Sequence, residues 1–270
     1  MPRYSRTAVI AGGTRGMGLA ISESFFRQGF NVIVMARDVS VVKGLEKEWR
    51  GVSQSSEFGS LAGYAVDAVD ELAVVEIAAA LQSKYASIDI LVNNIGGVHR
   101  SRKFLDLEPT DWLESFNLNV LPMVIVSKAF FPALKNSKCA RLINISSVTG
   151  LEPGEFSPHY SASKAATINF SKHLANAWAV YGITVNCIAA GSINSSALHG
   201  IMDNQALEES RSVEEVSEAV LSAIGRNIPL GRLGVPKDIA NLVDYLVSPG
   251  ADWITGATVT IDGGKHKGIF

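Results

Sequence analysis

An apolar segment, a glycine-rich turn and a helical pattern follow one another near the start of the chain, and this order constrains the fold more than any other feature. Residues 7–11 are apolar and strand-like, and residues 12–18 read Gly-Gly-Thr-Arg-Gly-Met-Gly. Glycines in this position let the backbone approach a pyrophosphate, which sits at the positive N-terminus of the following helix. The segment predicts a dinucleotide-binding turn; a tight turn without a ligand is the alternative.

Further apolar segments alternate with helical patterns roughly every 25 to 30 residues. Residues 31–36, 61–66, 88–92 and 141–146 are the expected strands. Such alternation implies right-handed crossovers and a doubly wound parallel sheet with helices on both faces, a Rossmann-like α/β fold. The chain of 270 residues, 47% of them hydrophobic, is long enough to bury a large core, and we expect one domain over residues 1–270.

Charge and cysteine content narrow the class of protein. The net charge of −2 gives no electrostatic footprint for nucleic acid or an anionic membrane. The N-terminus lacks the apolar core of a signal peptide, and no apolar run reaches the roughly 20 residues that span a bilayer. Cys139 and Cys187 lie in apolar, strand-like contexts, and we expect buried free thiols. A cytoplasmic protein that acts on a small molecule, without a nucleic-acid or membrane partner, is expected.

The residues after the second expected strand bear on which dinucleotide binds. An acidic residue there hydrogen-bonds the ribose 2′-hydroxyl of NAD, whereas arginine accommodates a 2′-phosphate. Arg37, together with Arg15 from the glycine turn, favours NADP(H) over NAD(H). Asp38 would take the acidic role if the strand ran one residue longer, but an exposed N-cap of the next helix is the favoured interpretation. Asp67, after the third strand, is placed to contact the adenine.

Tyr160 and Lys164 are the first candidates for chemistry. If the segment from Tyr160 onward is helical, the two side chains stand four residues apart on one face. A nearby cation favours phenolate over phenol, so Lys164 is expected to lower the pKa of Tyr160 from roughly 10 toward neutrality. Ser147, at the end of an expected buried strand, would hydrogen-bond the same substrate oxygen.

With these motifs in this order, the chain resembles the classical short-chain dehydrogenases/reductases over essentially its whole length. The matching residues are Gly12-x-x-x-Gly16-x-Gly18, Asn93-Asn94-Ile95-Gly96, Asn119, the spacing of Ser147, Tyr160 and Lys164, Ala190-Gly191-Ser192-Ile193-Asn194-Ser195, and residues 229–236, 253–256 and 261–264. The departures are Ala11 for threonine, Ile95 for alanine, Ala190 for proline and Ser195 for threonine. Ala11 and Ala190 are small substitutions outside the chemistry, and Ser195 retains a hydroxyl that can hydrogen-bond the cofactor amide.

The resemblance implies about seven strands, hydride transfer between a nicotinamide and a carbonyl carbon, and assembly as a homotetramer, with a homodimer as the alternative. It implies the catalytic residues Asn119, Ser147, Tyr160 and Lys164. It implies the cofactor-binding residues Gly12, Thr14, Arg15, Gly16, Met17, Gly18, Arg37, Asp67, Ala68, Asn94, Gly96, Tyr160, Lys164, Gly191, Ile193 and Ser195. No metal is expected.

The expected reaction is NADPH-dependent reduction of a ketone or 3-oxo group to a secondary alcohol, or its reverse. Reduction of a 3-oxoacyl group on acyl carrier protein is an alternative, weakened by Tyr181 where those enzymes often carry arginine. An NAD-dependent alcohol dehydrogenase is a second alternative, and a non-catalytic cofactor-sensing protein is a reading from a different class.

Substrate recognition is expected in three segments. Residues 192–226 carry Val213, Val216, Val220 and Ile224 at helical spacing, which indicates one amphipathic helix and a lid over the cleft. An ordinary solvated helix is the alternative. Residues 99–103 would grip a substrate anion, although a solvated charge run is favoured. Glu152, Glu155 and Phe156 are further candidates for lining the pocket.

Overall fold

The computed structural model describes residues 6–52, 58–98 and 101–269. It contains a seven-stranded sheet in the order β3-β2-β1-β4-β5-β6-β7, and every pair of neighbours is parallel. The strands are β1 (Thr7–Ala11), β2 (Asn31–Ala36), β3 (Ser60–Ala65), β4 (Ile90–Asn93), β5 (Arg141–Ser147), β6 (Thr184–Ala190) and β7 (Thr258–Ile261). The predicted fold class is confirmed, and the expected strands 61–66 and 88–92 are displaced by only one or two residues.

The sheet is wound in both directions from its centre. β1 pairs with β2 on one side and with β4 on the other, so the chain reverses its direction of travel across the sheet between β3 and β4. Parallel strands bring all their carboxyl ends to one edge, and ligands bind beyond that edge at the point of reversal. The register places Asn93 opposite Ala11, and Ala190 opposite Ser147. Segments distant in sequence are therefore neighbours at this edge.

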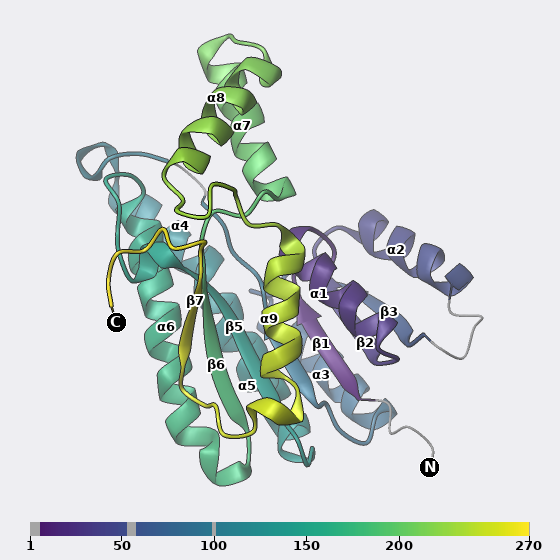
Figure 1. Cartoon of the computed structure of the whole chain (residues 1–270). Coiled ribbons are helices and arrows are strands. Elements are labelled where there is room, and N and C mark those ends of the chain that lie inside the picture. The colour runs from purple at the N-terminus through teal and green to yellow at the C-terminus, as the bar shows by residue number, and fades with distance from the viewer. Residues whose placement is uncertain (1–5, 53–57, 99–100, 270) are drawn as a thin grey trace.

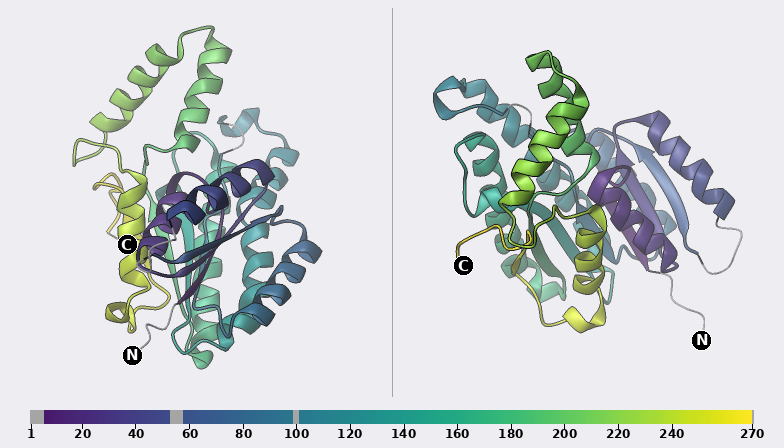
Figure 2. Two further views of the ribbon diagram at one scale, coloured as in Figure 1. Left: turned by 90° about the vertical axis from the view of Figure 1, so that its right-hand side faces the viewer. Right: turned by 45° about the horizontal axis from the view of Figure 1, so that its top comes forward.

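Helices cover both faces (Figures 1 and 2). One layer contains α1 (Gly16–Arg27), α2 (Val39–Val52) and α9 (Pro236–Leu246), and the other contains α3 (Glu71–Lys84), α4 (Pro109–Asn119), α5 (Leu121–Lys135) and α6 (Pro158–Trp178). The strands supply near-continuous apolar runs because both of their faces are buried. Phe25 of α1 and Val243 of α9 pack on one face, and Phe130 of α5 and Leu174 of α6 pack on the other.

Two helices project beyond the carboxyl edge of the sheet as a hairpin (Figures 1 and 2). They are α7 (Ser196–Glu209) and α8 (Val213–Arg226). Met202 and Ala206 of α7 bury against Val216 of α8, so the hairpin has a small apolar core of its own. The expected helix corresponds to α8, although Val213 is 44% exposed. The helix α7 was not predicted, because its apolar residues form no clear stripe.

The most apolar helical stretch is Pro109–Lys135, which is long and apolar enough to cross a membrane by composition. Its most apolar window has a mean hydropathy of 1.4 and is half buried within the protein. Val126, Phe130 and Leu134 of this stretch pack into the core between the sheet and the helix layer that contains α5 and α6. Core packing therefore accounts for its apolar character.

Both cysteines are free thiols, as predicted. Cys187 lies in β6 and is fully buried. Cys139 is only half buried and lies in a turn before β5, so the expectation of a buried, strand-like context is wrong for this residue.

Candidate active site

Ser147 and Tyr160 meet at the carboxyl end of β5. Ser147 is the last residue of β5, and Tyr160 lies in the first turn of α6, which begins at Pro158. The short helix η2 (Val148–Gly150) joins them and rests on α6 so closely that a Cβ on Gly150 would lie 2.7 Å from the Lys164 carbonyl carbon. The two side chains are hydrogen-bonded to each other. The structure therefore brings the two hydroxyls together, and their shared hydrogen bonding to a substrate oxygen stays a prediction.

Thr149 fixes the orientation of the Ser147 hydroxyl. Its backbone amide donates to Ser147 Oγ at 3.2 Å, and its own hydroxyl donates to the same oxygen at 3.0 Å. A serine oxygen has two acceptor positions and one hydrogen to donate. Because Thr149 occupies both acceptor positions, the Ser147 hydrogen is directed elsewhere. Thr149 was not predicted from the sequence, since a lone threonine in a loop carries no signal.

Lys164 lies one helical turn after Tyr160 and is 5% exposed. Its ammonium donates to the Ile145 carbonyl at 3.2 Å and lies 5.7 Å from the centroid of the Tyr160 ring. Burial lowers its pKa to about 8, because the charged form loses hydration that one carbonyl replaces only in part. The predicted placement on the same helix face is confirmed.

The pKa of Tyr160 moves in the direction opposite to the expected one. Burial raises it above its ordinary value, and the hydrogen bond with Ser147 offsets only part of that rise. The Lys164 ammonium is directed toward the Ile145 carbonyl rather than toward the phenol oxygen. The expectation that Lys164 depresses this pKa is therefore wrong for the cofactor-free protein, in which Tyr160 is a neutral phenol at pH 7.

Asn119, the last residue of α4, is buried beside Lys164. Its side-chain oxygen accepts from the Gly97 amide at 2.9 Å, and its side-chain nitrogen donates to the Gly97 carbonyl at 3.1 Å. A Cβ on Gly96 would lie 2.5 Å from Asn119 Oδ1 and 3.0 Å from Lys164 Nζ. Only glycine at position 96 leaves room for these two side chains to converge.

A buried polar network supports the site from below. Asn93 of β4 donates to Ser127 at 3.0 Å and to Asn144 at 2.8 Å, and Asn144 donates to Ser171 at 2.8 Å. These bonds connect two strands to α5 and α6 under the Ser147 end of β5. Sequence reasoning missed Ser127, Asn144 and Ser171; the available signal was an amide in the middle of an apolar strand.

The glycine turn has the geometry that a pyrophosphate needs. Gly12 and Gly16 have φ of +82° and +54°, which L side chains rarely adopt. A Cβ on Gly18 would lie 2.0 Å from the Gly12 carbonyl oxygen, so α1 begins directly against the turn. Asn94 donates to that same oxygen at 3.0 Å. The Arg15 side chain makes no capping hydrogen bond at the N-terminus of α1, where a pyrophosphate would bind.

A second segment approaches the glycine turn from β6. A Cβ on Gly16 would lie 3.7 Å from the Ser195 Cβ, and Ser195 is the residue before α7. Gly191 packs against Asp262, where a Cβ would lie 2.5 Å from the aspartate Cβ. Ile193 is buried and pairs with Gly234. These expected cofactor residues therefore lie across from the turn, whose Thr14 and Met17 are half buried.

The residues expected at the adenine end lie at the same edge of the sheet. Arg15 and Arg37 are both exposed, Asp67 is exposed, and Ala68 is buried. The Asp38 carboxylate accepts from the amides of residues 40 and 41 at 2.8 and 3.2 Å, and the hydrogen bonds with Ser40 hold its pKa below the ordinary value. The interpretation of Asp38 as the N-cap of α2 is confirmed.

The segments expected on the substrate side contact each other. Lys103 forms an ion pair with Glu155 and lies 5.5 Å from the centroid of the Phe156 ring. The Ser157 amide donates to the Arg102 carbonyl at 2.8 Å, which joins the loop after β4 to the loop before α6. Lys103 is thus already paired with an acid of this chain. His99 and Arg100 lie outside the described residues.

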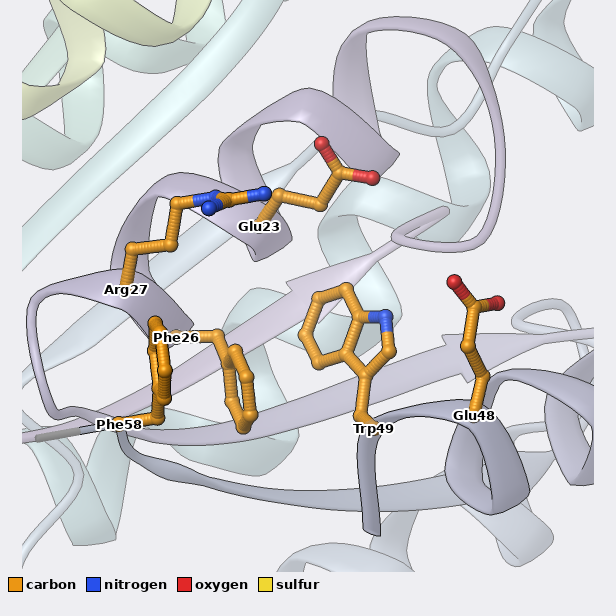
Figure 3. Close-up of a pocket in the computed structure, with 6 residues that line it drawn as sticks. All are labelled: Glu23, Phe26, Arg27, Glu48, Trp49 and Phe58. Atoms are coloured by element: carbon orange, nitrogen blue, oxygen red, sulfur yellow. The ribbon is translucent and has the colours of Figure 1, made fainter. Parts of the chain in front are cut away.

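Two cavities lie away from these residues. One, of about 100 Å³, lies between α1 and α2, and Figure 3 shows Phe26, Trp49 and Phe58 around it with Arg27 and two glutamates at its rim. The other, of about 430 Å³, lies between α8 and the loop before α9. Neither is lined by Ser147 or Tyr160. Within the described part of the chain, no group of three or more His, Cys, Asp or Glu side chains is arranged to hold a metal ion.

The comparisons with known proteins agree with this geometry. Residues 11–266 match the family model described as enoyl-(acyl carrier protein) reductase. The chain is 32% identical to the 3-oxoacyl-(acyl-carrier-protein) reductase of Haemophilus influenzae, over 97% of this chain and 98% of that protein.

Two solved structures resemble the whole chain. L-Sorbose reductase from Gluconobacter frateurii, complexed with NADPH and L-sorbose, is 25% identical with a TM-score of 0.88 over 98% of both chains. Actinorhodin polyketide ketoreductase with NADPH is 27% identical with a TM-score of 0.86, also over 98% of both chains. The chain belongs to the short-chain dehydrogenase/reductase family and is an NAD(P)-dependent oxidoreductase that acts on carbonyl and alcohol groups.

Proposed function

We propose that the protein reduces a ketone or 3-oxo group to a secondary alcohol with NADPH, and catalyses the reverse oxidation with NADP. The observation that supports this most directly is the hydrogen-bonded pair of Ser147 and Tyr160, with Lys164 one helical turn away, at the edge of the sheet that also carries the glycine turn. Hydride comes from the nicotinamide when the cofactor is bound. The residues of the chain supply position, hydrogen bonds and the proton.

Tyr160 acts as the proton donor in the reductive direction. Its raised pKa keeps the phenol protonated at pH 7, which is the state that a donor requires. Ser147 donates its remaining hydrogen to the substrate oxygen, and both hydroxyls stabilise the negative charge that develops there. Removal of this pair of donors leaves the carbonyl unpolarised.

Lys164 and Asn119 take part in the transfer of protons from solvent to Tyr160. The ammonium of Lys164 has a pKa of about 8, so it is charged at pH 7 and gives up a proton near that pH. Asn119 lies next to it across Gly96, where a water held by both side chains would connect Lys164 to solvent. Lys164 also presents a donor for the hydroxyls of the nicotinamide ribose.

The remaining cofactor residues divide by the part of the dinucleotide that they face. Gly12, Gly16 and Gly18 hold the pyrophosphate with Thr14 and Met17. Ser195, which lies across from Gly16, hydrogen-bonds the nicotinamide amide. Asn94 and Gly96 border the ribose, and Gly191 and Ile193 border the nicotinamide. Arg15 and Arg37 bind the 2′-phosphate, which supports NADP(H) over NAD(H), and Asp67 and Ala68 border the adenine.

The substrate is proposed to be a small carbonyl or alcohol compound. It binds under the α7–α8 hairpin, which serves as a lid. Residues 1–270 are proposed to form a single domain. The relatives named above reduce a carrier-bound 3-oxoacyl group, a sugar and a polyketide by their names, so the reaction is shared while the substrate varies. Carrier-bound 3-oxoacyl groups, and NAD in place of NADP, are the alternatives.

Assembly as a homotetramer in the cytoplasm is part of the same proposal. Met123, Phe130 and Leu174, on the helices α5 and α6, are buried in the core of the chain itself. Large apolar residues that are exposed on α4 and α5 are instead Leu113, at 66%, Leu121, at 41%, and Phe116, at 38%. Sedimentation equilibrium tests the assembly, and a monomer would contradict it.

A panel of ketones, sugars and 3-oxoacyl thioesters, assayed with NADPH and NADH in parallel, tests cofactor and substrate together. Tyr160→Phe is expected to reduce kcat by about 10²- to 10⁴-fold, the usual contribution of a positioned general acid, with NADPH affinity close to that of the wild type. Fluorescence titration of NADPH provides that affinity. Retained turnover in Tyr160→Phe would refute the assignment of the proton donor.

A further inference from the structure

The segment after β7 is fastened across the carboxyl edge of the sheet. In Figure 1 this yellow tail leaves the top of β7 and runs toward α6. The Asp262 carboxylate accepts from the amides of Gly264 and His266, at 2.8 and 2.5 Å. The Lys267 amide donates to Glu152 at 3.0 Å, and Glu152 lies in the loop between Ser147 and α6. The tail therefore forms part of the wall around the candidate active site.

Lys265 is the residue of this tail that faces the end of β6. Its ammonium donates to Ser192 Oγ at 3.3 Å, and the side chain is half buried. Ser192 lies two residues beyond Ala190, the register partner of Ser147. Ser192 therefore follows the strand end that lies beside Ser147, and the Lys265 ammonium bonded to it lies at the same edge of the sheet as the candidate catalytic residues.

The charge of Lys265 is not neutralised within the described residues, where no carboxylate lies within ion-pair distance of its ammonium. The two acids of the same wall have other partners. Asp262 accepts two backbone amides, and Glu152 accepts the Lys267 amide with His266 Nε2 at 3.9 Å. Lys103, by contrast, is paired with Glu155. A half-buried ammonium that has only a hydroxyl partner retains donors for an anion.

We propose that Lys265 and Ser192 bind a carboxylate of the substrate, so that the preferred substrates are short oxo acids and the corresponding hydroxy acids. The inference rests on the proposed reaction and names its substrate class. The ammonium and the adjacent hydroxyl present two donors, which match the two oxygens of a carboxylate. A carboxylate is favoured over a phosphate because Glu152 and Asp262 lie in the same wall and oppose a dianion.

Matched substrates provide the first test. Oxo acids in which two to five bonds separate the carbonyl from the carboxylate are compared with their methyl esters, using NADPH. The wild type is expected to prefer one acid by about 10- to 100-fold in kcat/KM, the range for hydrogen bonds to charged groups. Lys265→Met is expected to abolish that preference through KM, with ester reduction unchanged, and Lys265→Arg to restore most of it.

Lys267→Met is the matched control, because its side chain is exposed and only its backbone amide contacts Glu152. It is expected to retain the preference for acids. Circular dichroism melts show whether each variant is folded. Equal use of acids and esters by the wild type, or a preference that survives in Lys265→Met, would overturn the assignment and leave the proposed reductase activity intact.

Equilibrium binding separates the two proposals. Calorimetric titration of the hydroxy acid product into the NADP-loaded protein measures the anion site without turnover. Binding that is at least about 10-fold weaker in Lys265→Met supports the site, and equal binding by both proteins contradicts it. If no carbonyl compound of any kind is reduced, the proposed function fails, while the calorimetric result still decides whether Lys265 binds a carboxylate.

Discussion

Thr149 donates to Ser147 twice, from its backbone amide at 3.2 Å and from its hydroxyl at 3.0 Å. The two bonds fill the acceptor positions of Ser147 Oγ and leave its single hydrogen free to be donated, to Tyr160 in the cofactor-free protein and to the proposed substrate oxygen when substrate is bound. Thr149 is therefore a positioning residue, which acts through Ser147. A loop threonine with no recognisable motif controls the direction of a catalytic hydroxyl.

Thr149→Val removes the side-chain donor and leaves the backbone donor. The Ser147 hydroxyl then rotates among more orientations, and kcat is expected to fall about 2- to 10-fold, which corresponds to one neutral hydrogen bond. KM is expected to change little, because the bond serves orientation. Thr149→Ser retains the hydroxyl and is expected to have the wild-type kcat. A wild-type kcat in Thr149→Val would show that the backbone amide alone orients Ser147.

Much of the site was predictable because its residues have a fixed spacing on one regular element. Tyr160 and Lys164 stand four apart on α6, and Asp38 caps α2 as its position before a helix implied. The direction of the Tyr160 pKa was not predictable, since it depends on burial by segments that are distant in sequence. The helix α7 was not predicted because its apolar residues form no clear stripe, and Met202 and Ala206 are buried against α8 rather than against the sheet.

Lys164→Met tests the burial of a charge. The pKa of Lys164 is about 8 in the folded protein and near 10.5 in the unfolded chain. Between these two pH values the unfolded chain binds more protons than the folded protein, so the free energy of unfolding rises with pH. Below pH 8 the buried charge costs up to roughly 3 kcal/mol, from 1.36 kcal/mol per pKa unit. The variant is expected to be more stable than the wild type at pH 7, with an advantage that shrinks toward pH 10.

Urea denaturation of both proteins at pH 7, 8.5 and 10 measures that advantage. Taking the difference between the two proteins cancels the titration of groups that they share. Lys164→Arg is the control, because it keeps the charge at every pH tested, and its stability difference from Lys164→Met is expected to stay constant. A difference between Lys164→Met and the wild type that does not change with pH would contradict the lowered pKa.

Gly18→Ala and Gly44→Ala test the close approach of α1 to the glycine turn. A Cβ at position 18 would lie 2.0 Å from the Gly12 carbonyl oxygen, whereas a Cβ at position 44 meets nothing within 4 Å. Gly18→Ala is expected to lose about 1 to 3 kcal/mol of unfolding free energy, as overpacked sites do, and to weaken NADPH binding. Gly44→Ala, within α2, is expected to gain about 0.5 to 1 kcal/mol. A Gly18→Ala variant as stable as the wild type would show that the turn can accommodate a Cβ at position 18 without loss of stability.

Arg37→Ala tests the choice between the two dinucleotides. Removal of one guanidinium from the 2′-phosphate is expected to lower kcat/KM with NADPH by about 10- to 100-fold and to leave the value with NADH within twofold, because NADH lacks that phosphate. Asp38→Ala is the neighbouring control. Its carboxylate is bonded to the amides of residues 40 and 41, so the change is expected to lower stability and to leave the ratio of NADPH to NADH activity unaltered. A tenfold loss of NADH activity in Asp38→Ala, or an equal loss with both cofactors in Arg37→Ala, would reverse the assignment of these adjacent residues.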